Sequence, residues 1–155
     1  MESLRVNNCA YVELNYLKDG ADGVLSVAEC GREVPFSVQR VYYIYHLNQP
    51  QAIRGKHAHV QNRQVLFCIN GSFRLLLDDG RRRQEVVLDR PNVGVYMDVM
   101  LWHEMRDFSD NCILLVLASD LYDEADYIRN YDDFLKRAKE GQPEMPDFLK
   151  RIKEG

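Results

Sequence analysis

RGKHAHVQNRQVLFCING, from Arg54 to Gly71, is the stretch from which we predict the fold. Its residues are typical of two short β-strands, and the Asn-Gly pair at its end is a strong signal for a two-residue turn. Because residues i and i+2 of an extended strand share a face, His57 and His59 should project into one space. Paired imidazoles with a pKa near neutrality can transfer protons, bind a metal ion in the neutral form, or form a hydrogen-bonded pair at a half-exposed edge. The spacing alone leaves these three uses open.

Length and composition are those of an ordinary globular domain. We expect residues 1–155 to form one domain with its own core. A formal net charge of −4 gives no reason to expect nucleic acid or an anionic membrane as a partner. No apolar stretch approaches a membrane span, and the N-terminus lacks the pattern of a signal peptide. The cysteines form no CxxC pattern and are expected to be reduced, which favours a cytoplasmic protein: Cys9, Cys30, Cys68 and Cys112.

About ten short β-prone segments follow one another between residues 9 and 119, with turn signals between them. Residues 9–17 and 23–30 flank a turn cluster and should pair as an N-terminal hairpin. Asn70-Gly71 and the run Asp78 to Gly80 are predicted to close two further hairpins. Such a pattern predicts an all-β domain of the jelly-roll type.

The strand around residues 40–45 is rich in tyrosine on both of its predicted faces. Period-two alternation puts Arg40, Tyr42 and Ile44 on one face and Val41, Tyr43 and Tyr45 on the other. Simple β-propensity explains aromatic residues on both faces, so the pattern alone gives neither face a role.

The last part of the chain, about residues 124–155, changes to a helical pattern. A helix should begin after Asn130 as its N-cap and end at Gly141, with Phe134 and Ala138 on its apolar face. A second short helix is predicted over residues 147–153. Both helices should pack on the outside of the β-domain.

Taken as one pattern, the central stretch resembles the first motif of the cupin superfamily. His57, His59, Gln64 and Gly71 have the spacing of that motif, although glutamate commonly occupies the place of Gln64. Gly94 and His103 match the second motif, which lies on a strand of the opposite wall. The resemblance implies a double-stranded β-helix, a form of jelly roll, with C-terminal helices added to it.

A closer resemblance is to the FdtA-like dTDP-sugar 3,4-ketoisomerases. It is carried by RVYYIY (Arg40 to Tyr45), RGKHAH (Arg54 to His59), LDDG (Leu77 to Gly80), WHE (Trp102 to Glu104) and LVLASDLYDEADYIRNYDDF (Leu115 to Phe134). Members of that family convert dTDP-4-keto-6-deoxyglucose to a 3-keto isomer, for deoxyamino sugars of surface glycans such as O-antigens and S-layer glycans. The resemblance implies homodimers that exchange N-terminal strands, and it implies no cofactor and no metal.

Site residues follow from the resemblance and from the chemistry together. Moving a ketone from C4 to C3 through an enediol requires a base and an acid, for which the resemblance makes His59 the base and His57 its proton-shuttling partner. Arg54 could stabilise the enediolate or hold a diphosphate oxygen. Further candidates for substrate binding are Tyr43, Tyr45, Gln64, Tyr96, Trp102 and His103. Tyr45 is a second donor for the enediolate, Tyr96 or Trp102 a partner for thymine, and His103 a wall of the cavity; core packing is the equal alternative for Tyr43 and Tyr45.

Two other functions remain open at this point. His57, His59 and His103 could form a three-histidine metal site of a metal-dependent cupin, although the neutral amide of Gln64 is a poor substitute for a carboxylate ligand. A catalytically silent cupin that binds a sugar nucleotide is the third possibility. The paired histidines count against it, because a binding site needs no acid and base.

Overall fold

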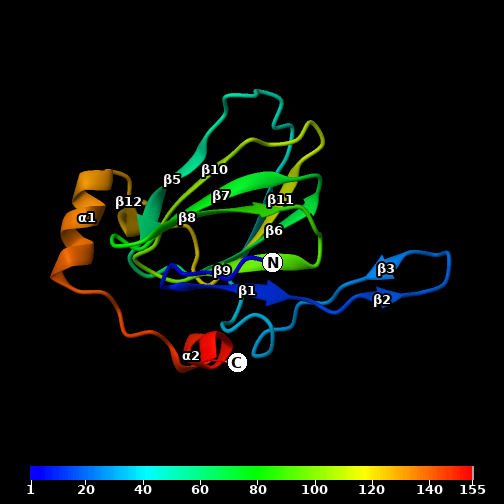
Figure 1. Ribbon diagram of the computed structural model, residues 1–155, viewed down its shortest axis with the longest axis horizontal. Helices are drawn as coiled ribbons and strands as arrows, with labels where there is room; N and C mark the ends of the chain where they lie inside the picture. The colour runs from blue at the N-terminus through cyan, green and yellow to red at the C-terminus, as the bar shows by residue number, and fades with distance from the viewer. Residues whose placement is uncertain (155) are drawn as a thin grey trace.

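Two five-stranded antiparallel sheets face each other in the computed structural model, which describes residues 1–154 (Figure 1). The first sheet has the order β1-β9-β6-β11-β4 and consists of β1 (Cys9–Glu13), β4 (Arg40–Ile44), β6 (Gln64–Asn70), β9 (Val93–Met97) and β11 (Ile113–Ala118). The second has the order β12-β5-β10-β7-β8 and consists of β5 (Arg54–His59), β7 (Phe73–Asp78), β8 (Arg83–Leu88), β10 (Trp102–Arg106) and β12 (Tyr127–Ile128). The all-β jelly-roll prediction is confirmed.

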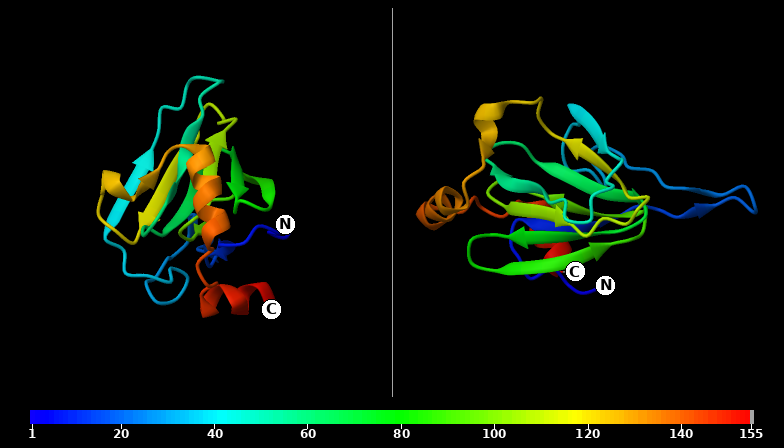
Figure 2. Two further views of the ribbon diagram at one scale, coloured as in Figure 1. Left: turned by 90° about the vertical axis from the view of Figure 1, so that its left-hand side faces the viewer. Right: turned by 90° about the horizontal axis from the view of Figure 1, so that it is seen from above.

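The two sheets lie over one another in the view from above (Figure 2), and the side chains of the main core fill the space between them. Leu66 of the first sheet and Leu75 of the second are fully buried in it. Burying each such leucine contributes roughly 1.5–3 kcal/mol. On the outer face of the first sheet, Gly94 on β9 allows close packing, because a Cβ at that position would lie 2.6 Å from the carbonyl oxygen of Leu66 and 2.7 Å from the ring of Phe67.

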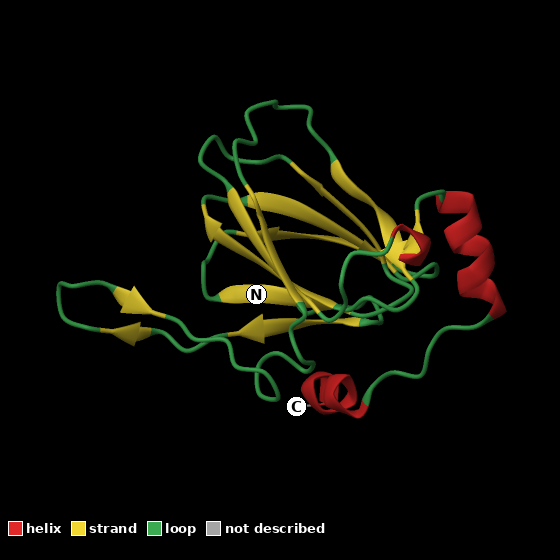
Figure 3. Ribbon diagram, turned by 180° about the vertical axis from the view of Figure 1, so that it is seen from behind, coloured by secondary structure: helices red, strands yellow, loops and turns green. Residues whose placement is uncertain are grey.

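Both predicted helices are present and cover the outer faces of the sheets (Figure 3). α1 (Tyr131–Glu140) is capped by Asn130 as predicted, and its Phe134 packs against Trp102 on the second sheet. α2 (Asp147–Glu154) covers the first sheet, where Leu149 is fully buried. Among the helices of residues 1–154, none is long and apolar enough to cross a membrane.

Two predicted hairpins differ from the structure. β1 pairs with β9 and not with the segment that follows it, because this pairing buries its apolar side chains; only β2 (Leu17–Lys18) and β3 (Val24–Leu25) pair with each other, in a projecting ribbon. The turn at Asn70-Gly71 is real, with Gly71 at a φ of 75°, but it carries the chain from the first sheet to the second. The hairpin at Asp78 to Gly80, which joins β7 and β8, is confirmed.

Candidate active site

A cavity of about 470 Å³ opens beside the strands that carry the paired histidines. It is lined by Arg40, Tyr42, Ile44, Ile53, Arg54, Gly55, His57, His103, Met105, Tyr127 and Arg129. These residues come from β4 of the first sheet, from β5, β10 and β12 of the second, and from adjoining segments. The cavity is therefore built where the two sheets meet along β4 and β5.

Three imidazoles gather at this cavity. The ring centroid of His57 lies 4.8 Å from that of His59 and 4.5 Å from that of His103, and the last two are 6.2 Å apart. His57 and His103 are directly opposed in the pairing of β5 with β10, so their side chains project from the same face. Tyr127 on β12 closes the cluster, with its ring 4.6 Å from that of His59.

A β-bulge sets the direction of His57. Between the pairs His103 with His57 and Glu104 with Gly55, Lys56 is the extra residue on β5. Gly55 and Lys56 have φ values of 80° and 56°, and the carbonyl oxygen of Gly55 lies 3.0 Å from Nδ1 of His57. Bulges commonly re-aim side chains next to functional sites. Here the bulge brings the carbonyl oxygen of Gly55 to Nδ1 of His57, and this contact fixes the orientation of the imidazole.

Asp126 fixes the ring of His59 from the end of the 3-10 helix η1 (Glu124–Asp126). Its Oδ2 lies 2.9 Å from Nδ1 of His59, and both side chains are nearly buried. Its two oxygens also accept hydrogen bonds from the backbone N–H groups of Val60, Gln61 and Asn62. Because a carboxylate only accepts, Nδ1 of His59 must carry the proton. The lone pair therefore sits on Nε2, which is buried without a hydrogen-bond partner among the described residues.

Burial keeps the three histidines neutral. It lowers the pKa of His57 to about 4, with the neighbouring His59 adding to the shift. Burial also lowers the pKa of His59, although the Asp126 carboxylate opposes that shift. The pKa of His103 is lowered well below its ordinary value by burial. Neutral imidazoles can accept a proton at neutral pH, so the cluster is equipped for general base chemistry.

Positive charge surrounds the cavity. Arg40 places its guanidinium 5.3 Å above the ring of Tyr42, and its buried Nε has no hydrogen-bond partner among residues 1–154. Arg54 begins β5 and lines the same cavity. Within the described residues neither arginine forms an ion pair with a carboxylate, whereas Arg129 is held by both oxygens of Glu124. Two unpaired guanidinium groups suit an anionic ligand such as a phosphate.

Several predicted site residues are brought together here. His57, His103 and Arg54 line the cavity, and the ring of His59 adjoins that of His57. Gln64 is buried on β6 and donates a hydrogen bond from Nε2 to the hydroxyl of Tyr42, over 2.8 Å.

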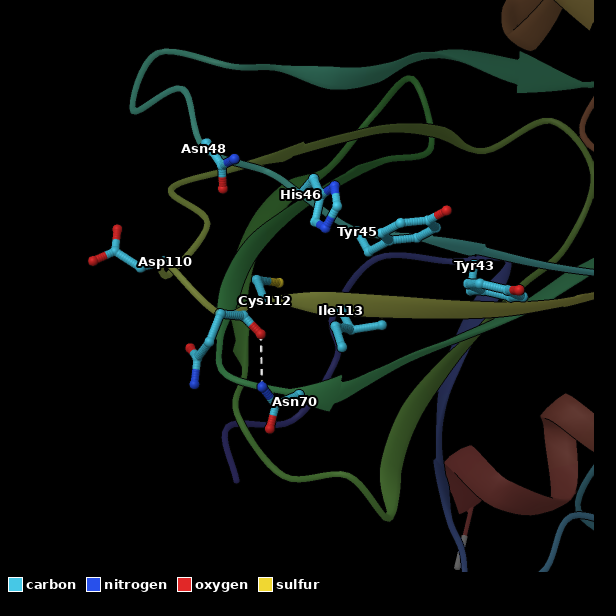
Figure 4. A pocket seen from close by; sticks show the side chains of 9 residues that line it. Tyr43, Tyr45, His46, Asn48, Asn70, Asp110, Cys112 and Ile113 are labelled. Atoms are coloured by element: carbon cyan, nitrogen blue, oxygen red, sulfur yellow. Dashed lines mark hydrogen bonds between the residues drawn. The ribbon is translucent and has the colours of Figure 1, made fainter.

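Tyr43 and Tyr45 lie outside the histidine cavity, on the opposite face of β4 (Figure 4). Their rings stack on each other at 5.7 Å, and the two side chains are 62% and 54% exposed. They line a separate pocket of about 510 Å³ together with His46. The alternation of β4 turns Tyr42 to the histidine cavity and Tyr45 away from it, and a contact of Tyr45 with the sugar stays a prediction.

Tyr96 and Trp102 are also outside the cavity, so neither is placed to stack on a base there. Tyr96 is fully buried on the outer face of the first sheet, where its ring meets Phe148 of α2 at 4.8 Å. Trp102 packs under α1 against Phe134, and its Nε1 donates to Glu104 over 3.2 Å. Since Trp102 and His103 are neighbours on one strand, they point to opposite faces.

Residues that the sequence analysis did not select complete the site: Arg40, Tyr42, Asp126, Tyr127 and Arg129. Alternation had already grouped Arg40 with Tyr42, but nothing local indicated that their face was the inner one. Asp126, Tyr127 and Arg129 fall in the polar and aromatic segment after β11, which carried part of the resemblance. That unusual composition after a buried strand was the available signal.

The jelly roll and its histidine-lined cavity define a cupin equipped for proton transfer. The family model described as "FdtA: WxcM-like, C-terminal" matches residues 7–139, and the chain belongs to this family. TDP-4-oxo-6-deoxy-alpha-D-glucose-3,4-oxoisomerase of Aneurinibacillus thermoaerophilus is 53% identical over 114 residues, which are 74% of this chain and 81% of that protein.

Solved structures agree with this assignment. A mutant of the 3,4-ketoisomerase QdtA from Thermoanaerobacterium thermosaccharolyticum, in complex with TDP-4-keto-6-deoxyglucose, is 39% identical with a TM-score of 0.83. The match covers 87% of this chain and 96% of that one. The WlaRB TDP-quinovose 3,4-ketoisomerase from Campylobacter jejuni is 44% identical with a TM-score of 0.80, over 84% of this chain and 99% of its own.

Proposed function

We propose that this chain is a 3,4-ketoisomerase that converts dTDP-4-keto-6-deoxyglucose to its 3-keto isomer. The observation that carries the proposal is the pair of neutral imidazoles, His57 half-buried at the cavity and His59 buried and fixed by a carboxylate, beside unpaired arginines. The relatives named for this reaction and the solved complex with the 4-keto sugar nucleotide support it. The product would serve the synthesis of deoxyamino sugars for surface glycans.

The reaction needs only the movement of protons. In our proposal Nε2 of His59 removes the proton from C3, which the adjacent C4 carbonyl makes acidic, and an enediol forms between C3 and C4. His57 carries the proton of the O3 hydroxyl to O4. His59 then returns a proton to C4, where a hydroxyl remains, and O3 becomes the ketone. All atoms are conserved.

Arg40 and Arg54 are our candidates for the diphosphate of the substrate. They are the cavity arginines without carboxylate partners in the described chain, and a guanidinium forks well onto phosphate oxygens. His103 would form part of the cavity wall against the sugar, since it lines the cavity with its ring beside that of His57.

In our proposal the reaction proceeds without a metal. Among residues 1–154, no group of three or more His, Cys, Asp or Glu side chains is arranged to hold a metal ion. The amide of Gln64, at the motif position where glutamate is common, donates to Tyr42. We therefore route no step through a metal.

An NMR time course with dTDP-4-keto-6-deoxyglucose and EDTA-treated protein tests the proposed function. We expect a 3-keto product, and the coupling at C4 would assign its gluco or galacto configuration. Turnover only after a divalent metal is restored would favour the metal-dependent cupin. Binding of dTDP without turnover under either condition would favour a silent sugar-nucleotide-binding protein.

We further propose a cytoplasmic homodimer with exchanged N-terminal strands, without nucleic acid or membrane as partners. In this dimer β1 would pair with β9 of the partner copy in the register that it has with β9 of its own chain here. Exposed apolar side chains gather on the projecting ribbon, at Leu17, Val24 and Leu25, and on the outer face of β4. Patches of this kind are typical of protein interfaces. The four free cysteines fit the reducing cytoplasm.

A cross-linking experiment tests the strand exchange. Glu13 of β1 lies opposite Val93 of β9, and cysteines at these two positions should form a disulfide wherever the strands pair. In our proposal the oxidised variant runs as a covalent dimer on a denaturing gel. An internal disulfide in a chain that sediments as a dimer would reject the exchange alone, and a monomer in sedimentation would reject the homodimer.

A further inference from the structure

A short turn between β9 and β10, residues 98–100, holds the backbone of the proposed base. The N–H of Met100 donates to the carbonyl oxygen of His59 over 2.8 Å. Met100 has a φ of 56°, in the left-handed region that a non-glycine residue seldom adopts unless its surroundings fix it there. The residues that fix this turn therefore help to set the position of His59 at the end of β5.

Asn8, which directly precedes β1, fixes the turn from outside the cavity. Its carbonyl oxygen accepts from the N–H of Asp98 over 2.8 Å, and its Nδ2 donates to the carbonyl oxygen of Val99 over 3.5 Å. The same Nδ2 donates to Oε1 of Gln142 over 2.6 Å, and both bonds can form together because an amide NH₂ group has two protons. Gln142 is held in turn, since its Nε2 donates to the carbonyl oxygen of Asp79.

Burial and backbone conformation suit Asn8 to this task. Asn8 is 3% exposed, and its φ of 61° lies in the left-handed region that asparagine tolerates better than most residues. It does not line the cavity, and the proton transfers proposed above do not use it. Its partner Gln142 lies beyond residues 7–139, which the family model matches.

We infer that Asn8 is a positioning residue for His59: it holds the turn at residues 98–100, and the turn holds the main chain of the base. The inference rests on the proposed function. Asp126 orients the ring of His59, and Asn8 sets the place of the backbone that carries this ring. Because Asn8 directly precedes β1, the exchanged dimer proposed above would bring Asn8 of one copy to the turn of the other.

Asn8→Gly is the first test, because glycine adopts a φ of 61° freely and lacks the amide. We expect kcat to fall about tenfold, since a displacement of roughly 1 Å at the reacting groups can cost up to about 10² in rate, with little change in KM. Asn7→Gly is the matched control, the same substitution one residue earlier. The backbone N–H of residue 7, which donates to Asp79, is kept in this control, and its kcat should equal that of the natural protein.

A second control separates loss of stability from loss of position. Val86→Ala on β8, at the edge of the second sheet, should lower the melting temperature and leave kcat unchanged below that temperature. NMR of the imidazole protons gives the second readout, in which the Nδ1 proton of His59, bonded to Asp126, is assigned by its absence in His59→Asn. Asn8→Gly should shift this signal or speed its exchange with water, whereas Val86→Ala should leave it in place.

Mixed dimers test whether Asn8 acts between copies. Asn8→Gly keeps His59 and His59→Asn keeps Asn8, so an exchanged dimer of the two variants has one site with both residues. Such dimers can be isolated after co-expression with two affinity tags. We expect the kcat per Asn8→Gly copy to return to the natural value. A kcat that stays at the level of Asn8→Gly alone would overturn the action between copies.

The positioning role itself can fail in two ways. A kcat of Asn8→Gly within about twofold of the natural value, with an unchanged His59 signal, would overturn it while the proposed function stands. Equal losses of kcat in Asn8→Gly and Asn7→Gly would also reject it, because they would show a general effect of glycine before β1. No turnover by the natural protein would remove the proposed function, and this inference with it. Circular dichroism establishes that each variant is folded.

Discussion

Replacing Asp126 with asparagine should disable the site although the two side chains have nearly the same shape. Oδ1 of Asp126 accepts from the N–H groups of Val60 and Gln61, and Oδ2 accepts from Asn62 and from Nδ1 of His59. Asparagine offers only one oxygen, so its NH₂ group must meet donors at one of these two places.

Either orientation of the asparagine carries a cost that can be worked out. With NH₂ in the place of Oδ1, the backbone N–H of Gln61 loses its acceptor, whereas that of Val60 keeps the carbonyl oxygen of Asp126. With NH₂ in the place of Oδ2, one backbone N–H loses its acceptor, and Nδ1 of His59 must give up its proton to accept from the amide. A donor left unpaired at the partly buried Asn62 costs about 1–3 kcal/mol, which predicts a melting temperature lower by roughly 2–12 °C for a chain of this size.

The second orientation moves the imidazole proton to Nε2, where the base should have a lone pair. A comparable tautomer error in the catalytic triad of a serine protease costs about 10⁴ in kcat, and we expect a loss of between about 10² and 10⁴ here. Rates from the NMR assay, measured below the melting temperature, check this. Asp132→Asn, an exposed change on α1, is the control. A folded Asp126→Asn protein with kcat within about fivefold of the natural one would refute the role of this carboxylate.

Three further predictions concern pH and packing. In the folded protein the pKa values of His57 and His59 lie below the ordinary 6.5, so the acid limb of the pH profile of kcat/KM should lie below pH 6.5. The free energy of unfolding should decrease from about pH 6.5 toward pH 4, because the unfolded chain binds protons at these histidines first. An acid limb at or above pH 6.5 would contradict this. Gly55→Ala should lower both stability and kcat, because its Cβ would lie 2.8 Å from the carbonyl oxygen of His103 at a φ of 80°; unchanged melting and kinetics would show that the bulge relaxes freely. Leu149→Ala should cost about 2–5 kcal/mol in denaturant unfolding, whereas Ile152→Ala on the exposed side of α2 should cost little; equal effects would mean that α2 does not dock as described.

Local sequence patterns predicted much of the fold because their physical causes are local. Strand alternation put His57 and His59 on one side, and the cap at Asn130 with the stop at Gly141 gave α1 its bounds. The Asn70-Gly71 pair predicted a turn correctly. Whether a turn closes a hairpin or crosses between two sheets depends, however, on which distant strands the flanking strands pair with.

The site was predicted less completely, because its residues are brought together by contacts between distant parts of the chain. Alternation grouped the side chains of β4 correctly, yet only the position of β4 at the edge of the first sheet decides that Tyr42 faces the cavity. The hydrogen-bond partner of His59 is Asp126, which lies 67 residues later in the chain, and no sequence periodicity links two positions so far apart. Strand alternation could have predicted that Trp102 points away from the face of His103, because adjacent residues of a strand point to opposite faces.

Deuterium incorporation at C4 is the most direct test of the central claim, that Nε2 of His59 is the base of a 3,4-ketoisomerase. The substrate would be dTDP-4-keto-6-deoxyglucose in deuterated water, followed by NMR with the natural protein and with His59→Asn. We predict a 3-keto product that carries deuterium at C4, formed by the natural protein and absent with His59→Asn. A folded His59→Asn protein that forms the same deuterated product at a similar rate would contradict the account.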